Sequence, residues 1–290
     1  MAALRVAVVT GTARPHGIGR ACARAFVRAG YRVVGVDKLR LQDEPDAALG
    51  GSEYAHVVLD IAAPAEVGFV PRAVQQHFGS QDIHVLINCA AIADPHMPHK
   101  PDAALAHWRT VIDVNLTGAY MMSQAVIPHM PAGDASIIHV SSTRAHQSEP
   151  HTEAYAAAKA GLLGLAHAQA VSLAHKVRVN CVLPGWIDTS ADPGSITPAD
   201  HAWHLAGRVG RPEDVAELCL FLADSSKSGF ITGQEFVVDG GVTKKMVYPE
   251  EGPADDAPQQ QQQQQQAPDA AAAGGGTSAD ERAPVMWPDE

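Results

Sequence analysis

The chain contains 290 residues with a formal net charge of −11, and 46% of its residues are hydrophobic but only 5% are aromatic. It has no run of about 18 apolar residues and no basic cluster, which argues against a membrane span and against nucleic acid as a partner. The four cysteines are scattered without paired spacing. We therefore expect reduced thiols, no signal peptide before the first strand, and a cytoplasmic protein.

The first forty residues predict a strand, a glycine-rich turn, a helix and a second strand. Gly11, Gly17 and Gly19 lie in the turn. Such a unit binds a dinucleotide, because glycines let the pyrophosphate approach backbone N–H groups at a helix N-terminus. Asp37 follows Gly19 by eighteen positions, near the roughly 20 expected of an acid that binds the adenosine ribose. Since this acid would repel a 2′-phosphate, the sequence predicts NAD in preference to NADP.

Seven strands are predicted, near residues 4–9, 32–37, 55–59, 83–88, 135–141, 177–183 and 235–238. Helices in most of the gaps, joined by right-handed crossovers, give an α/β fold of Rossmann type, a doubly wound parallel sheet covered on both faces. Six candidate site residues lie at or just after the carboxyl ends of the predicted strands, where open α/β sheets bind ligands: Gly11, Asp37, Asp60, Asn88, Ser142 and Pro184.

Three residues near the middle of the chain suggest proton-transfer chemistry. Tyr155 and Lys159 are four positions apart in an alanine-rich run, which predicts that they share one face of a helix. A neighbouring ammonium favours the phenolate, so this phenol could exchange a proton with an alcohol or ketone. Ser142, thirteen residues before the tyrosine, could bind the carbonyl oxygen.

The composition changes at Pro249, so we predict one domain over residues 1–248 and a disordered tail over 249–290. The tail holds eight consecutive glutamines, nine acids and one arginine. It is interpreted as a dispensable extension, with a solubilising or partner-binding role as the alternative.

Taken together, these residues resemble the short-chain dehydrogenase/reductase family in its ordinary branch, over residues 4–243. The resemblance extends to LINCAAI, DVNLTG, IIHVSST and PGWIDT. It implies catalytic roles for Asn115, Ser142, Tyr155 and Lys159. It also implies cofactor contacts from the turn, the strand ends and the loop after the sixth strand: Gly11, Gly17, Ile18, Gly19, Asp37, Asp60, Ile61, Asn88, Ala90, Tyr155, Lys159, Pro184, Gly185, Ile187 and Thr189.

Two departures from the family pattern concern the cofactor site. Five residues separate Gly11 from Gly17, where the family places three, and Pro15 among them has no N–H to donate. Cys89 and Ala91 replace an asparagine and a glycine of the family's Asn-Asn-Ala-Gly stretch. The family pattern therefore does not specify which groups of the enlarged turn contact the phosphates.

The resemblance implies hydride transfer between nicotinamide and a secondary alcohol or ketone, in a homodimer or homotetramer paired through the helices near 101–130 and 155–174. A short polar segment between Thr189 and Arg208 favours a small sugar, polyol or hydroxy acid as substrate. Candidate substrate-lining residues are Ala93, Asp94, His96, Thr143, Arg144, His146, Glu149, His151 and Trp186. A 3-oxoacyl thioester reductase and a non-catalytic NAD-sensing scaffold are the alternatives. No metal is predicted, because the short-spaced pairs His96/His99 and His201/His204 lack further ligands.

Overall fold

The computed structural model describes residues 5–41, 46–98, 101–190, 192 and 194–247. One compact unit spans Met1–Lys245 and a second comprises Met246–Glu290. The predicted tail, residues 249–290, lies outside the described residues.

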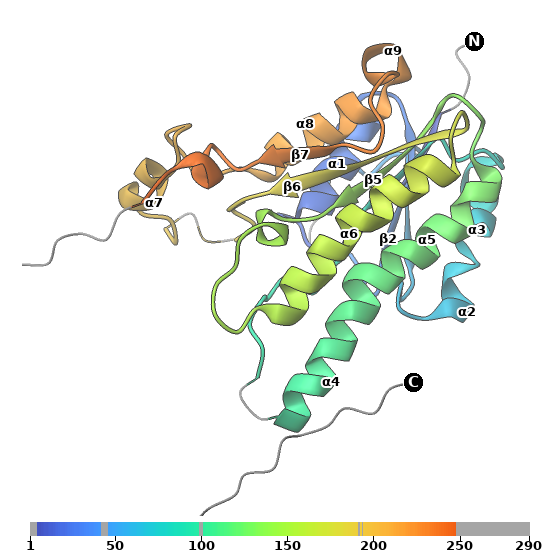
Figure 1. Cartoon of the computed structure of the whole chain (residues 1–290). Helices are drawn as coiled ribbons and strands as arrows, with labels where there is room; N and C mark the ends of the chain where they lie inside the picture. The colour runs from blue at the N-terminus through green and yellow to red at the C-terminus, as the bar shows by residue number, and fades with distance from the viewer. Residues whose placement is uncertain (1–4, 42–45, 99–100, 191, 193, 248–290) are drawn as a thin grey trace, which may run out of the picture. The chain divides into compact units, whose positions relative to one another are not determined.

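A seven-stranded parallel sheet forms the centre of the first unit, as the sequence predicted (Figure 1). The strands are β1 (Val6–Thr10), β2 (Arg32–Asp37), β3 (Tyr54–Val58), β4 (Val85–Asn88), β5 (Ala135–Val140), β6 (Val177–Pro184) and β7 (Glu235–Val238). Their order is β3-β2-β1-β4-β5-β6-β7, and every neighbouring pair is parallel. The chain order reverses between β1 and β4, which is where doubly wound sheets open a crevice for ligands.

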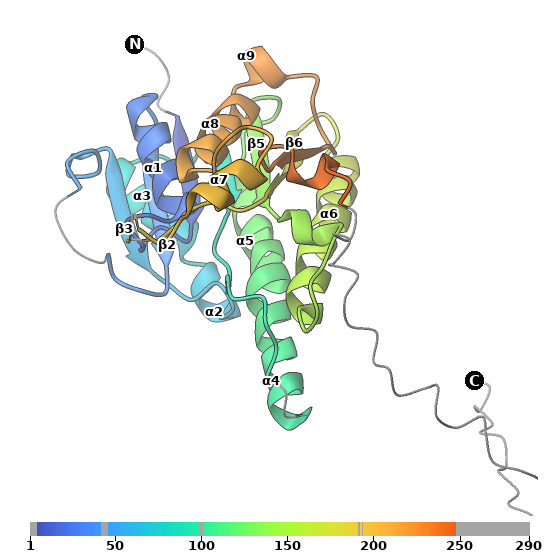
Figure 2. The same cartoon turned by 90° about the vertical axis from the view of Figure 1, so that its left-hand side faces the viewer.

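Helices cover both faces of this sheet (Figure 2). They are α1 (Ile18–Arg28), α2 (Pro64–Val67), α3 (Val70–Phe78), α4 (Pro101–Ile112), α5 (Gly118–Val126), α6 (Glu153–Ser172), α7 (Pro198–Trp203), α8 (Pro212–Ala223) and α9 (Ser225–Ser228). Side chains from α3, α5 and α6 pack on one face, and those from α1 and α8 pack on the other.

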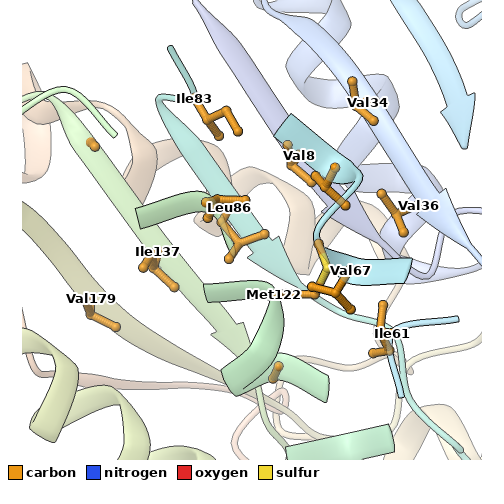
Figure 3. Close-up of a cluster of buried hydrophobic side chains, with 14 of the residues drawn as sticks. Val8, Val34, Val36, Ile61, Val67, Ile83, Leu86, Met122, Ile137 and Val179 are labelled. Carbon is orange, nitrogen blue, oxygen red and sulfur yellow. The ribbon is translucent and has the colours of Figure 1, made fainter. Parts of the chain in front are cut away.

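Alternation along the strands divides the core into two layers. In β1, Val6 and Val8 belong to the layer under α3, α5 and α6, whereas Ala7 and Val9 belong to the layer under α1 and α8. Figure 3 shows the first layer, where Met122 of α5 lies among strand side chains. Because both faces are covered, most side chains of the central strands are aliphatic, with buried polar exceptions such as Ser136 and His139 of β5.

Deleting residues 249–290 is expected to leave folding and catalysis intact. The last strand, β7, ends at Val238 and a short 3-10 turn follows at Val242–Lys244, so the sheet is complete before the deletion begins. The thermal midpoint should change by less than about 4 °C, which for a domain of this size corresponds to roughly 1 kcal/mol. Truncation after Gly233, which removes β7, is the destabilising control. A larger fall in the first protein would show that the tail packs on the domain.

Candidate active site

A cleft of about 430 Å³ runs across the carboxyl ends of the strands. The cleft is lined by most of the residues that were predicted from the sequence to bind the cofactor or to act in catalysis: Gly11, Gly17, Ile18, Gly19, Asp37, Asp60, Ile61, Ala90, Ser142, Tyr155, Lys159, Pro184, Gly185, Ile187 and Thr189. Asn88 and Asn115 are not among the lining residues.

The glycine-rich turn brings β1, α1 and the end of β4 into close contact. Gly11 has φ +79°, and a Cβ on it would lie 2.9 Å from the Cα of Ala90. The backbone N–H groups of Cys89 and Ala90 each donate to Thr10 Oγ1 at 2.9 Å. This approach explains why Gly11 must be glycine, and it identifies Thr10 as a structural partner that the sequence analysis missed.

Two arginines hold the enlarged part of the turn. Arg20, which is 2% exposed, donates from Nε to the Thr12 carbonyl at 2.6 Å and from Nη2 to the Ala13 carbonyl at 2.8 Å. Arg24 donates to the Pro15 carbonyl at 3.0 Å and pairs with Asp46 at 2.7 Å. The enlarged turn is therefore held through the carbonyl groups of Thr12, Ala13 and Pro15.

Asp37 occupies the end of β2 with its carboxylate already oriented. Oδ2 accepts from the Ala13 N–H at 2.9 Å, and Oδ1 accepts from the Leu39 N–H at 3.0 Å. The cleft wall beside it also carries Lys38 and Arg14. The acid therefore links the enlarged turn to the second strand, a second role that its position in the sequence did not indicate.

Ser142, Tyr155 and Lys159 meet in the same cleft. Ser142 begins the 3-10 turn after β5, and its Oγ accepts the N–H of Arg144 at 3.2 Å. Lys159 is 4% exposed, its Nζ donates to the Val140 carbonyl at 2.9 Å, and it lies 5.5 Å from the centroid of the Tyr155 ring. A buried ammonium is thereby fixed next to a phenol that faces the cleft.

The two asparagines lie behind the cleft wall. Asn115 is in a π-helical turn, Asp113–Thr117, that interrupts the helix predicted near 101–130. Its side chain bonds to both backbone groups of Ile92, accepting at 2.8 Å and donating at 3.1 Å. The Asn88 side chain points into the interior, toward Ser123 and His139. Both amides therefore support the strand and loop that form the wall.

Of the predicted substrate-lining residues, Ala93 and Trp186 line the cleft and the others do not. Several side chains on the two neighbouring loops pair with one another. Arg144 binds Glu149 at 2.7 Å, and His96 approaches the same carboxylate at 3.8 Å. This ion pair holds the pKa of Glu149 below its ordinary value. His146 pairs with Glu235 at 3.0 Å. Asp94, Thr143 and His151 are likewise absent from the cleft wall.

Within the described ranges, no group of three or more histidine, cysteine or acidic side chains is arranged to hold a metal ion. His201 Nδ1 accepts from the Val209 N–H, and His204 Nδ1 donates to the Asp200 carbonyl. His99 lies outside the described residues. Among the helices of the described part, none is both long and apolar enough to cross a membrane.

His139, in β5 three residues before Ser142, is fully buried. Burial lowers the pKa of its imidazole from an ordinary 6.5 to about 4, and the nearby Lys159 ammonium acts in the same direction. Its neutral ring is bonded on both nitrogens, to Asn88 and to Gln169.

The buried imidazole should make stability fall with acidity. Between pH 6.5 and pH 4 the unfolded chain binds a proton at His139 that the folded chain does not, so the free energy of unfolding decreases as pH decreases in this window. The loss should reach roughly 3 kcal/mol by pH 4. His139→Gln keeps a neutral polar group and should lack this component. Denaturant titrations at several pH values give the free energy of unfolding of both proteins. If this free energy depends on pH equally in the two proteins, the prediction is wrong.

Comparison with known proteins was consistent with this geometry. Residues 11–243 match a family model described as enoyl-(acyl carrier protein) reductase. An uncharacterized oxidoreductase of Thermotoga maritima is 41% identical, over 85% of this chain and 98% of its own length. The cis-4-hydroxycyclohexanecarboxylate dehydrogenase of Sinomonas cyclohexanicum is 39% identical, over 82% and 96%. The solved structure of the aldohexose dehydrogenase of Thermoplasma acidophilum has a TM-score of 0.71 at 31% identity, over 85% and 98%.

Proposed function

The chain belongs to the short-chain dehydrogenase/reductase family of oxidoreductases, and from this premise we propose that it transfers a hydride between NAD and a secondary alcohol or ketone of a small polar molecule. The observation that supports this most is the cleft. It carries the glycine-rich turn and Asp37 at one end and the side chains of Ser142, Tyr155 and Lys159 at the other.

In the proposed reaction, Tyr155 takes the proton of the alcohol or returns it to the ketone oxygen, while the Ser142 hydroxyl hydrogen-bonds the same oxygen. Lys159, held against the Val140 carbonyl, keeps its ammonium beside the Tyr155 ring. Bound between the glycine-rich turn and the loop after β6, the nicotinamide cofactor would accept or supply the hydride. General acid–base help of this kind contributes about 10² to 10⁴-fold. A water-linked proton path through Asn115 stays a prediction from the family resemblance.

NAD is proposed as the preferred cofactor, because the oriented carboxylate of Asp37 suits two ribose hydroxyls and repels a 2′-phosphate. Asp37→Ala should weaken NAD binding at least about tenfold, since hydrogen bonds to a charged acceptor are worth about 1.5 to 3 kcal/mol. The substitution should also reduce the preference of the enzyme for NAD over NADP. Titration of both cofactors checks this.

Asp37→Asn is the matched control for the cofactor preference. It keeps an acceptor oxygen for the turn but removes the charge, so it should tolerate NADP better while the thermal midpoint is preserved. If kcat/KM with NADP equals or exceeds that with NAD in the unaltered enzyme, the assignment of Asp37 is wrong.

A sugar, polyol or hydroxy acid is proposed as the substrate. The Arg144–Glu149 ion pair on the loop after Ser142 and the polar segment after Thr189 support a hydrophilic substrate. The names of two similar proteins also support a small polar substrate. The Sinomonas cyclohexanicum dehydrogenase acts on a hydroxylated cyclohexane carboxylate, and the Thermoplasma acidophilum dehydrogenase acts on aldohexoses.

Assays of the purified protein with NAD and NADP against polyols, sugars, hydroxy acids and 3-oxoacyl thioesters test the proposal. Turnover of a small polar alcohol with NAD supports it. Activity on the acyl thioesters alone would mean that the substrate is a 3-oxoacyl thioester and not a small polar alcohol. Tight NAD binding without turnover of any compound would favour a sensing scaffold.

We also propose a homodimer or homotetramer that pairs through α4, α5 and α6. Large apolar side chains on these helices face solvent in the single chain, with Leu105 52% exposed, Tyr120 48% and Val171 77%. Such side chains mark an interaction surface when they gather on one face. Light scattering of the purified protein would give the mass, and a monomer at micromolar concentration would contradict the proposal.

A further inference from the structure

A chain of three polar side chains crosses the otherwise apolar layer beneath α6. Asn88 of β4 donates from Nδ2 to His139 Nδ1 at 3.2 Å, and Gln169 of α6 lies with Oε1 2.9 Å from His139 Nε2. All three are buried, with exposures of 4%, 0% and 6% for Asn88, His139 and Gln169. The partners of His139 lie 51 positions before and 30 positions after it in the sequence.

The chemistry of the neighbours defines the state of the imidazole. Nδ1 faces an amide N–H and must present a lone pair, whereas Nε2 faces a carbonyl oxygen and must carry the hydrogen. A second proton on Nδ1 would place two donors against each other. The ring is therefore neutral and held in one tautomer and one orientation.

Polar contacts join the β5 segment to the buried face of α6 at two places in the described part of the chain, and this chain of side chains is one of them. Near the start of the helix, Lys159 Nζ donates to the Val140 carbonyl at 2.9 Å, and Ser141 Oγ donates to the Lys159 carbonyl at 2.7 Å. Gln169 forms the other connection, ten residues further along the helix. Between them the buried contacts come from Leu162 and Ala166, whose apolar surfaces are non-directional and fix the rotation of a helix less strictly than hydrogen bonds do.

We infer that the Asn88–His139–Gln169 chain positions the catalytic groups by fixing the rotation of α6 about its axis. This inference rests on the proposed function, because Tyr155 and Lys159 on that helix must face Ser142, which follows β5. The three side chains touch neither substrate nor cofactor. A misplacement of about 1 Å in a reacting group can cost roughly 10²-fold in rate, so a small rotation of the helix would be visible in kcat.

The chain leaves two of its own atoms without partners, the Oδ1 of Asn88 and the Nε2 of Gln169, both buried. Unpaired buried polar atoms are costly, and replacing a buried polar pair by apolar groups of similar size is often neutral or stabilising. Stability and positioning can therefore be separated. The double variant His139→Leu/Gln169→Leu should have a thermal midpoint equal to or above that of the parent protein, yet a lower kcat.

The experiment measures kcat, the pH profile of kcat/KM for alcohol oxidation, NAD affinity and thermal midpoint, using a substrate accepted by the parent enzyme. For the double variant we expect kcat to fall at least about tenfold. The pH profile of kcat/KM should also change, because the Lys159 ammonium would no longer lie at its present distance from the Tyr155 ring. NAD affinity should stay within twofold. His139→Gln, which can still accept from Asn88 and donate to Gln169, should recover most of the activity.

Leu162→Ala is the control for a purely structural effect, since it leaves a cavity on the same face of α6 without touching the polar chain. It should lower the midpoint but leave the pH profile in place. The inference is overturned if the double variant keeps its kcat and pH profile, or if Leu162→Ala shifts the profile equally. Should the double variant not fold, Gln169→Met carries the same test. Tyr155→Phe in the same assay distinguishes the failures, because an active Tyr155→Phe would overturn the proposed function itself.

Discussion

Tyr155→Phe is expected to lower kcat by about 10² to 10⁴-fold, the usual contribution of a general acid or base. The lost hydroxyl acts on the proton of the substrate, whereas phenylalanine keeps the ring beside Lys159, whose Nζ lies 5.5 Å from the ring centroid. NAD affinity should therefore stay within about twofold. Steady-state kinetics and a binding titration check the two halves of this prediction separately.

Tyr120→Phe is the matched control, because Tyr120 lies on α5 with 48% of its surface exposed and is not among the residues that line the cleft. It should behave like the parent enzyme. Activity of Tyr155→Phe within tenfold of the parent, on a substrate that both accept, would remove Tyr155 from its proposed role. Binding of NAD without turnover in either protein would instead favour the scaffold.

The fold could be predicted because its signals are local. A strand covered on both faces is mostly aliphatic, so β1 and β4 stand out as short apolar runs between turns. Gly11 and Asp37 follow such strands, and parallel strands bring their carboxyl ends to one edge. The grouping of these residues in one cleft therefore follows from the order of elements alone.

The remaining features of the site depend on contacts between side chains and loops that no local pattern in the sequence specifies. Arg20 follows Gly19 like any helical surface residue, yet it is buried because the enlarged turn offers it two carbonyl groups. Arg144 and Glu149, candidate substrate-lining residues from the sequence, pair with each other, a contact that the sequence did not indicate. Whether a charged side chain faces a cavity or a neighbour is decided by loop geometry, which spacing in the sequence does not give.

Gly19→Ala is expected to disrupt cofactor binding and stability together. A Cβ at this position would lie 2.8 Å from the Thr10 carbonyl oxygen and 2.8 Å from the Gly11 carbonyl carbon, and it would overlap the Gly11 carbonyl oxygen. These are backbone atoms of β1 and the turn, so the first turn of α1 must move away from the strand. Because the backbone N–H groups that would face the pyrophosphate start there, NAD affinity should fall by about 10²-fold.

The same displacement should lower stability by about 1 to 3 kcal/mol, the usual range for overpacking a well-packed site, and thus the thermal midpoint by roughly 2 to 12 °C. Gly68→Ala is the control, since a Cβ there meets no atom within 4 Å and the backbone is right-handed, with φ −62°. It should leave both NAD affinity and the midpoint unchanged. If the Gly19→Ala protein has the NAD affinity and thermal midpoint of the parent, α1 does not approach β1 this closely. The proposed pyrophosphate-binding site at the start of α1 would then be wrong.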